Sequence, residues 1–92
     1  MIKSFRHSGV ERFFLTGSKA GIQPSHANKL NLQLTVLNRA RKPEDMAMPG
    51  WNLHLLSGDL KGHWSVKVNV NWRLTFRFDG EDVILVDYQD YH

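Results

Sequence analysis

The segment from Trp64 to Phe78 constrains the fold more than any other part of this sequence. Apolar residues occupy every second position on both sides of a short polar turn at 69–71. Because the side chains of a strand point alternately to its two faces, this period of two predicts a β-hairpin with one apolar and one polar face. The apolar face must be covered by other parts of the chain.

Two earlier segments can supply that cover, because their apolar residues recur at helical spacing. The first runs from about His7 to Thr16 and is followed by a glycine, a common helix stop. The second opens at Pro24 and ends near Arg41, shortly before another proline. Its apolar positions are Ala27, Leu30, Leu34 and Leu37.

The remaining elements are shorter. Residues 2–5 alternate as a small strand, residues 43–50 are a connector with one helical turn at 44–46, and residues 53–55 alternate again. Residues 83–88 are apolar at most positions, as in a central or doubly covered strand. The order β-α-α-β-β-β-β predicts a two-layer α+β fold, a mainly antiparallel sheet packed by two N-terminal helices, in a single domain over residues 1–92.

Composition excludes several classes of protein. With 92 residues and 41% hydrophobic content, the chain has enough apolar surface for one core and none for a second. It contains no cysteine, so a disulfide framework and a thiolate metal site are excluded, and a cytoplasmic location is expected. Neither a secretion signal nor a membrane-spanning run of about 18 apolar residues is found.

Charge is distributed unevenly along the chain. All 12 Lys and Arg residues lie between Lys3 and Arg77, whereas five of the nine acidic residues follow Arg77. A positive body attracts nucleic acid, because neutralising phosphates releases counterions. A basic protein without any nucleic-acid partner is the alternative.

The polar face of the predicted hairpin carries several groups that suit a phosphate. These are Lys67, Arg73, Thr75 and Arg77, and His54 joins them if its strand pairs in the same orientation. Neighbouring strands are about 4.8 Å apart, so such side chains can converge on one phosphate. The alternative is an ordinary solvated face of an antiparallel sheet.

The end of the chain, Asp87-Tyr88-Gln89-Asp90-Tyr91-His92, is dense in groups that transfer protons. The alternative is that these residues only cap a strand. His54, His63 and His92 lack the short helical spacing of metal ligands, so no metal or other cofactor is expected.

Four short motifs in a fixed order now make a family resemblance visible. Singly each is common, but together they are specific. They are Asn52-Leu53-His54 ahead of Gly58-Asp59, Gly62-His63-Trp64-Ser65, Asn71-Trp72-Arg73-Leu74-Thr75-Phe76, and the terminal Asp87-Tyr88-Gln89-Asp90-Tyr91-His92.

With the opening Met1-Ile2-Lys3-Ser4-Phe5, the chain resembles the HigB toxins of type II toxin-antitoxin systems, within the RelE-type superfamily, over essentially its whole length. The resemblance implies a RelE-like microbial RNase fold. It also implies an endoribonuclease that cuts mRNA in the ribosomal A site and is held inactive by a helix-turn-helix antitoxin of the HigA type. The matching catalytic positions are His54, Arg73, Asp90, Tyr91 and His92.

One loop departs from the family pattern. Many relatives read His-Pro-Leu-Lys-Gly where this chain reads His54-Leu55-Leu56-Ser57-Gly58. The lysine that would meet phosphate is replaced by Ser57, as in the related GraT-type toxins. Ser57 is therefore the residue expected to face RNA here, beside the phosphate-binding candidates Lys67 and Arg77.

These residues suggest a metal-independent mechanism in which RNA supplies its own nucleophile, the 2′-hydroxyl. Arg73 is expected to clamp the phosphate, since guanidinium is permanently charged and can hold two oxygens. His54 or His92 is expected to transfer protons, Tyr91 to orient or stack, and Asp90 to fix a histidine tautomer. The alternative function is a non-catalytic or attenuated RNA-binding or partner-binding module of the same fold.

Overall fold

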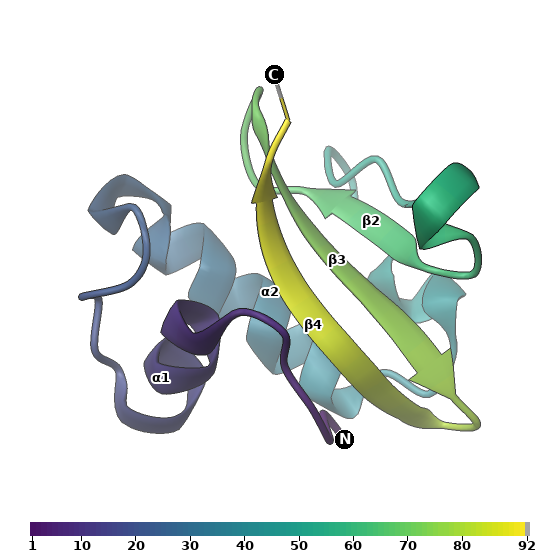
Figure 1. The fold of residues 1–92 in the computed structure, drawn as a ribbon, viewed down its shortest axis with the longest axis horizontal. Helices are drawn as coiled ribbons and strands as arrows, with labels where there is room; N and C mark the ends of the chain where they lie inside the picture. The colour runs from purple at the N-terminus through teal and green to yellow at the C-terminus, as the bar shows by residue number, and fades with distance from the viewer. Residues whose placement is uncertain (92) are drawn as a thin grey trace.

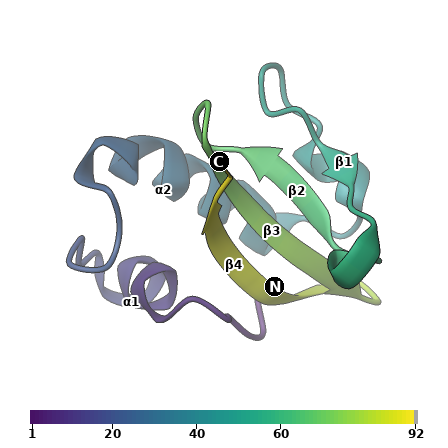
Figure 2. The same cartoon turned by 45° about the horizontal axis from the view of Figure 1, so that its top comes forward.

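The computed structural model of the protein describes residues 1–91, and its helices and strands form two layers (Figure 1). Helix α2 passes behind a four-stranded antiparallel sheet, and helix α1 lies to the side of β4 (Figure 2). This architecture confirms the predicted two-layer α+β fold. The elements are α1 (Ser8–Thr16), α2 (Ala27–Arg39), β1 (His54–Leu55), β2 (Trp64–Lys67), β3 (Trp72–Asp79) and β4 (Asp82–Asp90), in the sheet order β1-β2-β3-β4.

The core lies between α2 and the apolar face of the sheet. Phe76 and Leu74 of β3 and Val66 of β2 are completely buried, as the alternation predicted. Leu30 and Leu37 of α2 are equally buried on the other side of this core. Each such side chain contributes about 1.5–3 kcal/mol by leaving water, so this layer contact is the main source of stability.

Helix α1 agrees with its prediction to within one residue. His7 is its N-cap, and its Nδ1 accepts the backbone N–H of Val10 at 3.1 Å. Gly17 ends the helix in the left-handed region, φ 81°, where glycine carries no steric penalty. Its N–H donates to the carbonyl of Phe13 at 2.8 Å.

The second helix is shorter than predicted. Residues Pro24–His26 form a 3₁₀ turn, and the α-helix starts only at Ala27. It stops at Arg39 because Ala40 turns to an extended backbone, φ −67° and ψ 141°. The connector carries the expected helical turn, a 3₁₀ turn over Pro43–Met46.

The strand predicted at residues 2–5 is wrong as a regular strand. This segment contacts β4 through two isolated parallel bridges, Ile2 with Val83 and Phe5 with Val86. Between them, the backbone N–H of Leu85 donates to Ser4 Oγ at 2.9 Å instead of to a backbone carbonyl. A side chain has therefore replaced one rung of the ladder.

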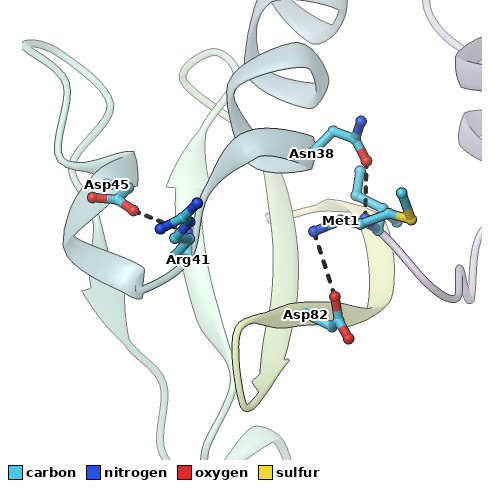
Figure 3. Close-up of polar contacts among 6 residues, drawn as sticks. Met1, Asn38, Arg41, Asp45 and Asp82 are labelled. Atoms are coloured by element: carbon cyan, nitrogen blue, oxygen red, sulfur yellow. Dashed lines mark hydrogen bonds and ion pairs between the residues drawn. The ribbon is translucent and has the colours of Figure 1, made fainter.

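Polar contacts fix this first segment against α2 and β4 (Figure 3). The Ile2 N–H donates to Asn38 Oδ1 at 2.9 Å, and the Met1 amino group lies 3.6 Å from Asp82. Just after α2, the Arg41 N–H donates to Asp45 Oδ2 at 2.9 Å and anchors the following turn. The beginning of the chain thus covers the outer edge of β4.

A bulge explains the apolar run of β4. Pairing with β3 shifts between Thr75 and Arg77, and Leu85 has a positive φ of 57°. The bulge changes the phase of alternation, so the buried residues are Val83, Val86 and Tyr88 while residues 84 and 85 stay half-buried. The strand lies between β3 and the N-terminal segment, so both of its backbone edges are paired.

Strand β1 is only two residues long and lies at the open edge of the sheet. Leu55, an apolar position of the predicted alternation over residues 53–55, is 56% exposed at this edge. No helix among residues 1–91 is long and apolar enough to cross a membrane.

Candidate active site on the open face of the sheet

The sheet face turned away from α2, here called the open face, carries most of the predicted site residues. Its strand register forms two rows of side chains. The first row joins His54, Ser65, Thr75 and Asp87 across β1 to β4, and the second joins Lys67, Arg73 and Gln89 across β2 to β4. The sequence left open whether His54 shares a face with the hairpin cations, and the register shows that it does.

The middle of the first row is not solvated, although it lies on the polar face and His54 at its end is exposed. Ser65 and Thr75 are 0% and 1% exposed. Thr75 Oγ1 accepts the side-chain N–H of Gln89 at 3.2 Å, and the same amide nitrogen donates to Asp87 Oδ2 at 3.2 Å. This network fixes the middle of the open face.

Arg73 lies at the centre of the second row. Its side chain is half-buried, and Nε and Nη1 are shielded from solvent with no hydrogen-bond partner among residues 1–91. Shielded donors of a permanent cation are costly when they lack an acceptor, so this position favours an anion. Lys67, directly across on β2, adds a second positive charge.

His54 has the geometry of a proton acceptor. Its Nδ1 lies 3.0 Å from the backbone carbonyl of Asn52. A carbonyl oxygen only accepts, so Nδ1 carries the hydrogen, and the neutral ring leaves the Nε2 lone pair available. Asn52 has a φ of 50°, a left-handed conformation that asparagine tolerates better than most residues.

The tail after β4 is hydrogen-bonded to the β2–β3 turn. The Tyr91 N–H donates to the carbonyl of Asn71, and the Tyr91 ring centre lies 5.9 Å from the guanidinium carbon of Arg73. At this distance the ring contributes a cation–π contact. Arg73 and Tyr91 are therefore brought together on the open face.

Asp90 has a different position from the other predicted catalytic residues. It is opposite Trp72 in the register, so its side chain starts on the face that carries Trp72, whereas Arg73 starts on the open face. Its charge is close enough to Tyr88 to affect that phenol. The predicted catalytic residue His92 lies outside the described residues.

Two further predicted phosphate ligands lie at the margins of the site. Arg77 is exposed on the open face, with its guanidinium over Gly62. Ser57 is exposed at the start of a 3₁₀ turn over Gly58–Leu60. The structure thus groups Arg73, Lys67 and Tyr91 closely and places Arg77 and Ser57 further out.

Sequence reasoning missed the roles of Ser65, Asp87 and Gln89 on this face. Their signal was available, because alternation from Arg73 through the register assigns them to the same side once the strands are aligned. It also missed His26, a buried residue whose partners are far away in sequence.

Within residues 1–91, no three His, Asp or Glu side chains are grouped as a metal site.

Solved structures place this architecture in the class of RelE-type toxin folds. The crystal structure of YafQ from E. coli strain BL21(DE3) superimposes with a TM-score of 0.66 at 16% identity, covering 98% of this chain and 91% of that one. The YoeB-YefM complex from Staphylococcus aureus gives a TM-score of 0.63 at 20% identity, covering 100% and 95% of the two chains. At these identities the likeness shows the fold.

The family follows from sequence similarity. A model of the HigB-like toxins, described as RelE-like toxin of type II toxin-antitoxin system HigB, matches residues 3–92. "Endoribonuclease HigB" of Proteus vulgaris is 36% identical over 92 residues and covers 100% of both chains. "Toxin HigB-1" of Vibrio cholerae is 34% identical over 95 residues, covering 100% of this chain and 98% of its own. The chain belongs to the HigB-like toxin family.

Family membership confirms the predicted resemblance, and the name of the Proteus relative supports the predicted class of enzyme, an endoribonuclease. A toxin of a type II system is expected to have an antitoxin partner.

Proposed function

We propose that this protein is a ribosome-dependent endoribonuclease that cleaves translated mRNA in the ribosomal A site. It acts in the cytoplasm and is neutralised by a helix-turn-helix antitoxin of the HigA type. The observation that carries the proposal is Arg73, whose shielded donors lack acceptors among residues 1–91 and lie between Lys67 and Tyr91 on the open face. A scissile phosphate supplies the missing acceptors.

In the proposed reaction, a histidine removes the proton of the 2′-hydroxyl, and the resulting oxyanion attacks phosphorus. The bond from phosphorus to the 5′ oxygen breaks, and that oxygen takes a proton as it leaves. His54 or His92 provides each proton transfer, and the His54 tautomer leaves Nε2 suited to accept one. Arg73 stabilises the charge that develops on the phosphate oxygens.

Tyr91 is proposed to orient a nucleotide by stacking, since its ring lies beside the phosphate clamp and its backbone is held by Asn71. Asp90 is proposed to fix a histidine tautomer by accepting its N–H. Tyr91→Phe should then keep full cleavage and Tyr91→Ala should not, in single-turnover assays. A loss of cleavage in Tyr91→Phe would instead show that the Tyr91 hydroxyl, and not stacking of the ring, is needed for cleavage.

Primer extension on mRNA translated by purified ribosomes tests the proposal. His54→Ala should lower the cleavage rate by roughly 10²–10⁴-fold, the usual contribution of a general acid or base. Leu55→Ala is the matched control, because Leu55 is the neighbouring exposed residue of the same strand. Its cleavage should equal that of wild type.

Two results would contradict the proposal. Cleavage of free RNA as fast as translated mRNA would remove the dependence on the ribosome. Growth arrest that persists in His54→Ala without any cleavage would favour a non-catalytic RNA-binding or partner-binding module.

A further inference from the structure

His26 joins three separate elements on the helix-covered side of the sheet. It lies at the start of α2 and is 7% exposed. Its Nδ1 lies 2.5 Å from the hydroxyl of Tyr88 in β4, and its Nε2 lies 2.7 Å from Nδ2 of Asn69 in the β2–β3 turn. The ring also meets Trp72 of β3 edge-on at 5.7 Å.

The orientation of the Asn69 amide determines the tautomer of His26. Asn69 Oδ1 accepts two backbone N–H groups, from Asn71 at 3.0 Å and from Trp72 at 2.9 Å. The amide nitrogen is therefore the atom that faces His26, and it can only donate. Nε2 of His26 must accept, so the neutral ring carries its hydrogen on Nδ1 and donates it to Tyr88.

The same turn holds the C-terminal tail. Asn69 fixes the N–H groups of residues 71 and 72, and the carbonyl of Asn71 accepts the N–H of Tyr91. A continuous series of hydrogen bonds thus runs from His26 through Asn69 and Asn71 to Tyr91. Tyr91 is the residue whose ring lies over the Arg73 guanidinium on the open face.

We propose that His26 is a positioning residue for the active site, acting through the Asn69 turn to fix the place of Tyr91 beside Arg73. This inference rests on the proposed function only where cleavage is concerned. The mechanical part, that His26 controls the position of Tyr91, holds for the free protein.

Protonation of His26 opposes this arrangement. A charged ring presents an N–H at Nε2 to the Asn69 amide, and two donors then face each other. Tyr88 is the titratable group in contact with His26, and it is itself flanked by His7 at 5.3 Å and influenced by Asp90. Acid therefore releases the turn from its anchor and loosens the tail.

Nuclear magnetic resonance of the free protein tests the mechanical part without any cleavage. In wild type, the Tyr91 amide shift should move with the midpoint of the His26 ring. This measurement needs no variant, so it stands even if a substitution of His26 fails to fold. A Tyr91 amide shift that does not follow the titration of the His26 ring would overturn the proposal.

Three variants then sharpen the test by hydrogen exchange at the Tyr91 amide. His26→Ala and Asn69→Ala should each raise its exchange rate roughly three- to tenfold, the effect of losing one hydrogen bond. Unlike Asn69→Ala, Asn69→Asp should leave the Tyr91 amide protected. One carboxylate oxygen can accept the two backbone donors while the other accepts an N–H from His26. Protection that persists in His26→Ala would exclude His26 as the anchor.

Single-turnover cleavage tests the link to the reaction. His26→Ala should lower the cleavage rate without weakening ribosome binding, and it should cause no further loss in a Tyr91→Ala background. Additive losses would show that His26 acts independently of Tyr91 and overturn the proposal. If wild type cleaves nothing, the proposed function fails, while the resonance measurements still decide the positioning role.

Discussion

The two faces of the sheet bury their side chains with opposite consequences. Phe76 and Thr75 are neighbours on β3, and they are 0% and 1% exposed. Phe76 packs into the core, where burial stabilises the fold. Thr75 is buried among polar groups on the open face, next to Ser65 and Arg73, whose shielded atoms lack hydrogen-bond partners within residues 1–91.

This contrast shows that burial alone does not identify a core. On the helix-covered face, shielding removes apolar area from water. On the open face, it keeps donors and hydroxyls away from water without satisfying them, which costs stability and prepares the surface for an anion. Substitutions on the two faces should therefore separate stability from activity.

The largest effect is expected from Phe76→Ala on the helix-covered face. Removing this fully buried ring should lower the free energy of unfolding by about 3–5 kcal/mol, because the cavity cannot collapse fully. Urea denaturation followed by tryptophan fluorescence measures it. A loss below about 1 kcal/mol would show that the contrast between the faces is wrong.

Arg73→Ala should give the reverse pattern. Cleavage of translated mRNA should fall by roughly 10²–10³-fold, the usual effect of removing a preorganised charge-stabilising donor. The free energy of unfolding should stay constant or rise, since the variant removes shielded donors that have no partner in the described part of the chain. The matched control is Arg39→Ala, an exposed cation at the end of α2, which should change neither quantity.

Acid should lower the free energy of unfolding through His26, which lies on the helix-covered side of the sheet. Burial lowers the pKa of His26 below its usual 6.5. The unfolded chain therefore binds a proton at a higher pH than the folded one, and stability falls as the pH drops below about 6.5, by at most about 1.4 kcal/mol per pH unit. Denaturation of wild type and His26→Ala across pH 7.5 to 5.5 checks this, and equal slopes would contradict it.

Base should also lower the stability of this cluster, in this case through Tyr88. Burial raises the pKa of Tyr88, and the charge of Asp90 adds to this, although a backbone hydrogen bond from Gln23 offsets part of it. Stability should then fall as the pH rises above 10, where the unfolded chain loses the phenolic proton first. Tyr88→Phe should remove this dependence in denaturation curves.

The smallest effects are expected for Thr75 and Ser65, the two buried residues of the first row on the open face. Thr75→Val removes the acceptor of the Gln89 side chain and should cost about 0.5–1.5 kcal/mol. Ser65→Ala removes a buried hydroxyl that has no partner among the described residues and should be neutral or slightly stabilising. Thermal melting of both variants provides the comparison, and an equal loss in each would show that Ser65 has a partner.

The sequence predicted the hairpin, both helices and the shared face of Arg73 and Lys67, because these follow from local periodicity, whereas the face of His54 depends on how its strand pairs. It did not predict the Leu85 bulge or the exposure of Leu55, which depend on what lies beside each strand. The His26 network was also missed, since its partners Asn69 and Tyr88 are 43 and 62 residues away. Periodicity reports which face a residue takes, but not which distant group it meets.

The two bridges between the N-terminal segment and β4 also have a consequence for the order of folding. They join residues 2–5 to residues 83–86, so the N-terminal segment can pair its backbone only after β4 is in place. Contacts of such long sequence separation form slowly and late. The same strand leads into Tyr91 beside Arg73, so the candidate site is assembled only once β4 has paired with β3.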